Sequence, residues 1–197
     1  MSEPDGLVRV RLTGRGGQGI MLAGAILAVS AMNEGKHVVQ TQEYGPEARL
    51  GATKTELVIS PRPIAFPLVT EPDILLCLSR DAFLRYGRLV APGGERLVDE
   101  SLEGELGDEG DDLVGPREPQ GVKPARPHTV YLPFRARARE LGNELFTNII
   151  ALGALVVETG VVGRESLAKA VEERVKPEYR EANARAMAEG FRLGAAR

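Results

Sequence analysis

The sequence is poor in the residues that hold metal clusters. It contains one cysteine, Cys77, and two histidines, His37 and His128, among 197 residues. A single thiol cannot form an internal disulfide, and it cannot supply the four thiolates that an iron–sulfur cluster usually takes. One cysteine and two distant histidines do not match a zinc site either. We therefore expect any redox cofactor of these kinds to sit on another chain, and no metal on this one.

Long apolar runs and a strong charge of one sign are lacking as well. No apolar run approaches the roughly 18 uninterrupted residues of a membrane span. Residues 1–6 are acidic and polar, unlike a signal peptide. The net charge is −3, whereas a general nucleic-acid binder is usually basic. These absences predict a cytoplasmic protein whose partners are neither membranes nor nucleic acids.

What is present indicates an ordinary globular domain. Hydrophobic residues make up 43% and charged residues 27%, and the length suits one domain over residues 1–197. Six segments have strand patterns: 7–12, 37–42, 54–60, 73–79, 95–98 and 129–133. Helices are predicted over 20–29, 80–90, 146–157 and 164–175, and in a last segment that begins near Pro177. We expect a Rossmann-like, three-layer α/β domain with a mixed or mostly parallel sheet and a helical C-terminal third.

Two segments stand out within this pattern. Residues 7–12 alternate apolar and basic side chains, which is typical of a strand with one covered face. Residues 99–127 are acidic and then rich in proline, so they predict a solvated loop within the domain rather than a domain boundary.

A glycine loop is the sharpest local signal. It comprises Gly14, Arg15, Gly16, Gly17, Gln18 and Gly19, and it matches G-x-G-x-x-G between a strand and a helix. Glycine permits positive φ angles and a close approach of backbone to ligand. Free N–H groups at such a helix start suit a pyrophosphate, although a tight packed turn remains the alternative. Glu43 comes late for the acid that binds NAD ribose, and no Lys-Ser/Thr follows to make a nucleotide P-loop.

A second charged loop spans Tyr44 to Gly51. It offers Glu47 and Arg49, with Lys54 just beyond. In an open α/β sheet, loops that leave the carboxyl ends of neighbouring strands line the ligand crevice. The two loops are then expected to face one another, with Arg49 and Lys54 able to meet phosphate. An exposed loop without a ligand is the alternative.

The remaining candidates favour structural roles. Cys77 lies in an apolar run and is expected to be an inert packing residue. His37 begins a strand, and Asn143 suits a helix cap. Asn148 falls inside a helix, where its amide needs a polar partner. Gly107-Asp108-Glu109 lacks the final glycine and the following asparagine of a thiamine diphosphate site.

Taken in order, four groups of residues resemble one known family. They are the glycine loop with Ala23-Gly24; Thr41 to Arg49; Val58-Ile59-Ser60 with Ile64, Pro67 and Asp73 to Leu76; and Leu141-Gly142-Asn143 with Asn148 and Leu152-Gly153-Ala154. The chain resembles the gamma subunit, or gamma domain in fused enzymes, of 2-oxoacid:ferredoxin oxidoreductases. The run ending at Arg49 is most similar to the 2-oxoglutarate branch. The family usually has Arg-Gly-Gly where this chain has Arg49-Leu50-Gly51.

The resemblance implies a heteromeric enzyme. Such enzymes convert a 2-oxoacid and CoA to acyl-CoA and CO2 and reduce ferredoxin, with thiamine diphosphate, Mg and iron–sulfur clusters on partner alpha, beta and sometimes delta subunits. The glycine loop, Arg49, Lys54 and Asn148 become the expected CoA contacts. No catalytic residue is expected here, so the chain alone should be inactive. A purely structural subunit and a free-standing dinucleotide-binding oxidoreductase remain the alternatives.

Overall fold

The computed structural model describes residues 6–43, 51–103 and 127–196, which build one six-stranded mixed sheet. The strands are β1 (Val8–Arg15), β2 (His37–Glu43), β3 (Ala52–Ser60), β4 (Ile74–Cys77), β5 (Glu95–Asp99) and β6 (His128–Leu132). Their order is β2-β3-β1-β4-β5-β6. Strand β3 is antiparallel to both of its neighbours, whereas β1, β4, β5 and β6 are parallel. The prediction of a mixed α/β sheet is thereby confirmed.

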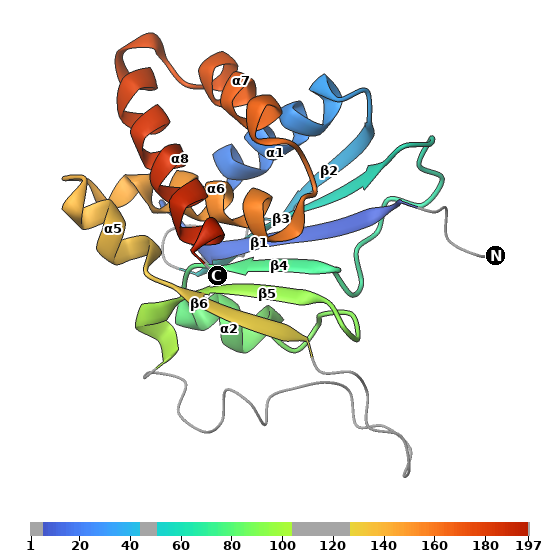
Figure 1. Ribbon diagram of the computed structural model, residues 1–197. Helices are drawn as coiled ribbons and strands as arrows, with labels where there is room; N and C mark the ends of the chain where they lie inside the picture. The colour runs from blue at the N-terminus through green and yellow to red at the C-terminus, as the bar shows by residue number, and fades with distance from the viewer. Residues whose placement is uncertain (1–5, 44–50, 104–126, 197) are drawn as a thin grey trace.

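Helices cover both faces of this sheet, as Figure 1 shows. They are α1 (Ile20–Asn33), α2 (Arg80–Tyr86), α5 (Phe134–Glu140), α6 (Thr147–Thr159), α7 (Arg164–Arg174) and α8 (Arg180–Ala195), with short 3-10 turns at η1 (Glu100–Leu102), η2 (Glu144–Phe146) and η3 (Pro177–Tyr179). Helices α1, α6, α7 and α8 lie on one face and α2 lies on the other. Within the described ranges, no helix is both long and apolar enough to cross a membrane.

The main core forms between the sheet and the larger helical layer. Helix α1 is apolar around most of its circumference because it is enclosed by strands on one side and by α7 on the other. Strand β4 is buried on both faces, as its continuous apolar run predicts, and the residues of β5 after Glu95 are buried as well. Helix α6 ends at Gly160, whose φ of 63° is the left-handed conformation that glycine adopts readily.

The opening β-α-β segment differs from the dinucleotide-binding arrangement in one respect. Strands β1 and β2 run in the same direction, but β3 lies between them and pairs with both. The end of β2 is therefore two strand spacings, or about 10 Å, from the glycine loop. Glu43, at that end, does not occupy the strand next to β1 from which a Rossmann acid reaches the ribose.

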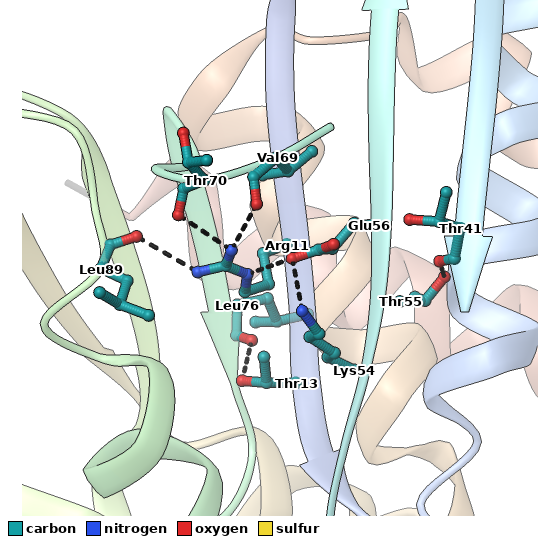
Figure 2. A network of polar contacts seen from close by, with 10 residues as sticks. All are labelled: Arg11, Thr13, Thr41, Lys54, Thr55, Glu56, Val69, Thr70, Leu76 and Leu89. Carbon is teal, nitrogen blue, oxygen red and sulfur yellow. Dashed lines mark hydrogen bonds and ion pairs between the residues drawn. The ribbon is translucent and has the colours of Figure 1, made fainter. Parts of the chain in front are cut away.

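The second face of β1 is covered, contrary to the prediction from its alternating pattern. Arg11 is only 2% exposed, because the β3–β4 connection and α2 both lie over it. Its guanidinium donates to Glu56 Oε1 at 2.7 Å, to the carbonyls of Val69 and Thr70, and to that of Leu89 (Figure 2). A buried guanidinium with these acceptors satisfies the backbone of a segment that has no regular secondary structure.

The acidic segment is described only at its ends. Asp99 completes β5, and its carboxylate accepts from Ser101 N–H and Arg135 N–H at 3.2 and 2.8 Å. Leu102 in η1 is buried, so the predicted loop begins later than residue 99. Residues 104–126, which carry most of the predicted loop, lie outside the described residues.

Candidate functional site

The glycine loop joins the carboxyl end of β1 to the start of α1. Gly17 and Gly19 have φ angles of 91° and 71°, so two of the predicted positions do require glycine conformations. Gly19 is the N-cap of α1, and no side chain caps it. The N–H groups of the first helical turn therefore remain available to an anion at this point.

Gln18 braces the loop internally. Its Oε1 accepts from Arg15 N–H at 2.6 Å, and its Nε2 donates to the carbonyl of Leu78 at 3.2 Å, beyond the end of β4. A Cβ at Gly14 would lie 2.6 Å from that Oε1, which explains the glycine there. Both polar atoms of the Gln18 amide are engaged, so its first role is to shape the loop.

Asn148 approaches the loop from α6. Its Nδ2 donates to the carbonyl of Gly19 at 3.1 Å, which supplies one of the partners expected for a buried amide. The residue is 4% exposed, and its Oδ1 is buried without a hydrogen-bond partner among the described residues. An unpartnered buried acceptor costs about 1–3 kcal/mol, so this oxygen is suited to a donor that arrives with a ligand.

Two cavities adjoin the loop, and Gly17 and Gly19 contribute to both. The large pocket has a volume of about 550 Å³ and lies between the loop, the start of α6 and the connection from α7 to α8. It is lined by Gly17, Gln18, Gly19, Leu22, Asn143, Leu145, Phe146, Asn148, Arg174, Val175, Lys176, Tyr179 and Asn183. The small pocket, about 320 Å³, is lined by Arg15, Gly16, Gly17, Gly19, Ile20, Met21 and Thr53.

The large pocket combines apolar walls with positive charge. Leu145 and Tyr179 are among the most exposed large hydrophobic side chains of the described residues. Arg174 and Lys176 lie on its rim, and none of the described residues that line it is acidic. Sequence reasoning did not identify these residues, because helix α7 and its end have no recognisable motif. Asn143 was predicted as a cap, and its Oδ1 does accept from Leu145 N–H at 2.9 Å.

Arg15, the cation among the residues that line the small pocket, has a carboxylate neighbour. Arg15 lies 3.6 Å from Asp81 of α2, and both side chains are about half exposed. An exposed pair of this kind contributes little stability, so Arg15 can exchange Asp81 for a ligand at small cost. Thr53 faces the loop and donates to the carbonyl of Gly14 at 3.4 Å.

The second predicted loop is only partly described. Arg49 and Glu47 lie outside the described residues, but the chain re-enters at Gly51, whose carbonyl accepts from Gly16 N–H at 3.4 Å. Lys54 lines neither pocket. Its Nζ lies 3.1 Å from Glu56 Oε1 and over the ring of Tyr86 in α2, on the sheet face that carries Arg11. The structure thus brings the glycine loop and Asn148 together, and it places Lys54 elsewhere; a phosphate contact by Lys54 stays a prediction.

Cys77 lies at the end of β4 and lines neither of the two pockets. The residue is fully buried, and burial raises the pKa of its thiol to about 11. Its Sγ donates to the carbonyl of Ser79 at 3.3 Å. The group is therefore a neutral packing residue at physiological pH, in line with the expectation from its apolar neighbours.

Cys77 should be unreactive in the folded protein. The thiolate is the nucleophilic form, and a thiol with a pKa of about 11 is almost wholly protonated at pH 8. We expect an aromatic disulfide reagent to modify Cys77 only after denaturant is added, with one thiol released per chain. Rapid labelling of the native protein at pH 8 would show that β4 opens readily.

Comparisons with known proteins agree along nearly the whole chain. A family model described as pyruvate ferredoxin/flavodoxin oxidoreductase matches residues 9–193. The 2-oxoglutarate synthase subunit KorC of Methanocaldococcus jannaschii is 42% identical, over 93% of this chain and 92% of that protein.

Solved structures extend the agreement to the fold. The gamma subunit of a keto/oxoacid ferredoxin oxidoreductase from Geobacter sulfurreducens is 37% identical and superposes with a TM-score of 0.77, over 96% of this chain and 97% of that one. The fold also recurs, at 19% identity and a TM-score of 0.77, in a 2-oxoglutarate:ferredoxin oxidoreductase from Magnetococcus marinus. There it covers 97% of this chain but 31% of the longer one.

Proposed function

The chain belongs to the pyruvate ferredoxin/flavodoxin oxidoreductase family, as a gamma-type subunit, and from this premise we propose that its glycine loop helps bind coenzyme A. Its relatives are subunits of 2-oxoacid:ferredoxin oxidoreductases, and two of them, 42% and 37% identical, are 2-oxoglutarate synthase subunits. The observation that carries the proposal is the uncapped start of α1, which opens beside a pocket with two cations and a buried, unpartnered Asn148 Oδ1.

CoA has chemistry that suits each part of this site. Its pyrophosphate suits the N–H groups of the first turn of α1, which begins at the end of the glycine loop. Its adenosine and pantetheine parts suit a pocket with apolar walls, and about 550 Å³ is within the usual range for such ligands. The structure of the Magnetococcus marinus enzyme was determined with CoA and succinyl-CoA bound, which supports CoA as the ligand class for this fold.

The role of the chain in the reaction is positioning. The complex converts a 2-oxoacid and CoA to acyl-CoA and CO2 and passes the electrons that are released to ferredoxin. This chain holds CoA so that its thiol meets an intermediate on a partner subunit, which converts a bimolecular step into one between fixed groups. Arg49 completes the phosphate contacts from the second loop. None of these tasks requires a nucleophile or a general acid on this chain.

We propose that the cofactors of the complex lie on the partner subunits. One cysteine does not suffice for an iron–sulfur cluster, and the sequence has no complete thiamine diphosphate motif. In this proposal the alpha and beta subunits, with a delta subunit in some enzymes, carry thiamine diphosphate, Mg and the clusters, in a cytoplasmic assembly. A free-standing NAD-dependent enzyme is disfavoured, because β3 separates β1 from the strand that ends in Glu43.

Substitution of Gly17 by valine tests the CoA role in the assembled enzyme. Gly17 has a φ of 91° and no atom within 4 Å of a built Cβ, so valine strains the backbone and fills the approach to the loop. We expect the KM for CoA to rise at least tenfold, with a smaller change in the KM for the 2-oxoacid. Arg49→Ala should have a similar effect, because a charge-assisted phosphate contact is worth about 1.5–3 kcal/mol.

Gly35→Val is the matched control. Gly35 has a φ of 75° and equally open surroundings, but it lies beyond the far end of α1. It reproduces the backbone strain without touching the site, so CoA kinetics should remain those of the unmodified complex. If Gly17→Val and Arg49→Ala both assemble and keep normal CoA kinetics, the chain is a structural subunit instead.

A further inference from the structure

Two positively charged residues line the large pocket outside the glycine loop. Arg174 ends α7 and Lys176 follows it, and both line the pocket. Neither forms an ion pair with any residue that the structure describes. Other cations nearby do have carboxylate neighbours: Lys169 lies 3.9 Å from Glu173, and Arg180 lies 4.0 Å from Glu172. Two cations on a pocket without acidic lining leave a site that favours an anion.

An aromatic side chain lies beside these two cations. Tyr179 belongs to η3, lines the same pocket and is 55% exposed. Its position is fixed from the backbone, because its N–H donates to the carbonyl of Lys176 at 2.9 Å and its carbonyl accepts from Asn183 Nδ2 at 2.9 Å. An exposed ring held in this way is suited to stacking on a nucleobase.

The polar floor of the pocket adds a separate indication of a ligand. Asn148 Oδ1 is buried and unpartnered, while its Nδ2 is already bonded to the carbonyl of Gly19. The oxygen can only accept, so it needs an N–H or O–H donor. The amino group of adenine and the hydroxyl of ribose are both donors of this kind.

We propose that Arg174, Lys176 and Tyr179 read the phosphorylated adenosine end of CoA. Tyr179 stacks on the adenine, and the two cations bind the phosphate on the ribose 3′ oxygen, while the glycine loop takes the pyrophosphate. The proposal rests on the proposed function and makes it more specific. It predicts that the enzyme selects CoA over dephospho-CoA, which differs only by that phosphate, and that Arg174 and Lys176 are the residues that discriminate.

The test compares CoA with dephospho-CoA in the assembled enzyme, by calorimetry and by steady-state kinetics. Arg174→Ala and Lys176→Ala should each weaken the binding of CoA about tenfold and leave the binding of dephospho-CoA unchanged, because only CoA carries the 3′-phosphate. Tyr179→Ala should weaken the binding of CoA and of dephospho-CoA by the same factor. Tyr179→Phe keeps the aromatic ring and should bind both ligands as the unmodified enzyme does. Lys169→Ala removes an exposed lysine of the same helix outside the large pocket, and it should alter neither.

The outcomes separate this proposal from the broader one. Equal weakening of both ligands by Arg174→Ala and Lys176→Ala, or no change in either, would show that the 3′-phosphate is read elsewhere. If Gly17→Val still raises the KM for CoA in that case, the CoA role stands, and Arg174 and Lys176 have no part in the selection of CoA over dephospho-CoA. If none of the variants changes the binding of CoA or dephospho-CoA, both proposals are wrong.

Discussion

Valine at Gly190 should destabilise the domain by about 3 kcal/mol or more, which is a large share of the stability of an ordinary domain. Gly190 lies in α8 against α6. A Cβ built there would overlap the carbonyl oxygen of Ile150 and lie 3.0 Å from the Cα of Gly153. These neighbours are backbone atoms of a buried helix, so they cannot rotate away, and α6 and α8 would have to separate. Urea unfolding followed by circular dichroism measures the loss.

Ala188→Val is the control for this substitution. Ala188 lies on the same helix and is exposed, so valine there changes helix propensity by well under 1 kcal/mol and meets no opposing backbone. Gly153→Ala should reproduce the destabilisation from the other side, because its Cβ would lie 2.7 Å from the carbonyl of Met187. If Gly190→Val unfolds at the same urea concentration as Ala188→Val, the close approach of α6 and α8 is not a source of stability.

The local elements could be predicted because their signals lie in neighbouring residues. The glycine loop between β1 and α1 follows from consecutive residues, and so does the end of α6 at Gly160. The predicted strands at 73–79 and 95–98 also lie close to the observed bounds of β4 and β5. In each case, the conformational preference of the backbone and the local burial pattern agree.

The strand order and the burial of the second face of β1 could not be predicted from these local signals. The alternation in residues 7–12 predicts an exposed face for Arg11, since a basic side chain is usually solvated. Its burial depends on Glu56, 45 residues later, and on the carbonyls of Val69 and Leu89. The insertion of β3 between β1 and β2 likewise results from long-range pairing, which the pattern of a single strand does not encode.

The same difference between local signals and long-range packing applies to the residues of the candidate site. Asn148 was predicted as a CoA contact, which stays a prediction, and the structure shows that its Nδ2 donates to the carbonyl of Gly19 in the loop. Arg174, Lys176 and Tyr179 were missed, because they join the pocket only through the packing of α7 against α1 and α8. Lys54 was grouped with the second loop by its distance in sequence. In a strand, however, successive side chains face opposite sides, so Thr53 faces the loop and Lys54 faces α2.

Arg11→Met should cost about 3–5 kcal/mol of unfolding free energy, the range for breaking a buried ion pair from one side. Methionine keeps much of the side-chain volume but leaves the buried carboxylate of Glu56 with Lys54 as its remaining cation in the network (Figure 2). It also removes the donors to Val69, Thr70 and Leu89. The loss should be largest where these carbonyls lie, so hydrogen exchange should accelerate at the amides of Asp73 and Ala91, which are bonded beside them.

The double variant Arg11→Met with Glu56→Gln distinguishes the ion pair from packing. Removing both charges leaves no uncompensated carboxylate, so the double variant should be more stable than the sum of the two single losses predicts, by about 1–3 kcal/mol. Arg85→Met is the control, because Arg11 and Arg85 both lie over the Tyr86 ring, at 5.7 and 5.4 Å from its centre, but Arg85 is exposed. Its loss should be about 1 kcal/mol or less, as for an exposed cation over an aromatic ring. Two outcomes would contradict this: the losses of unfolding free energy in the two single variants add up in the double variant, or Arg85→Met costs as much as Arg11→Met. Either would mean that the Tyr86 contact and side-chain packing stabilise this face, and that the Arg11–Glu56 pair contributes little.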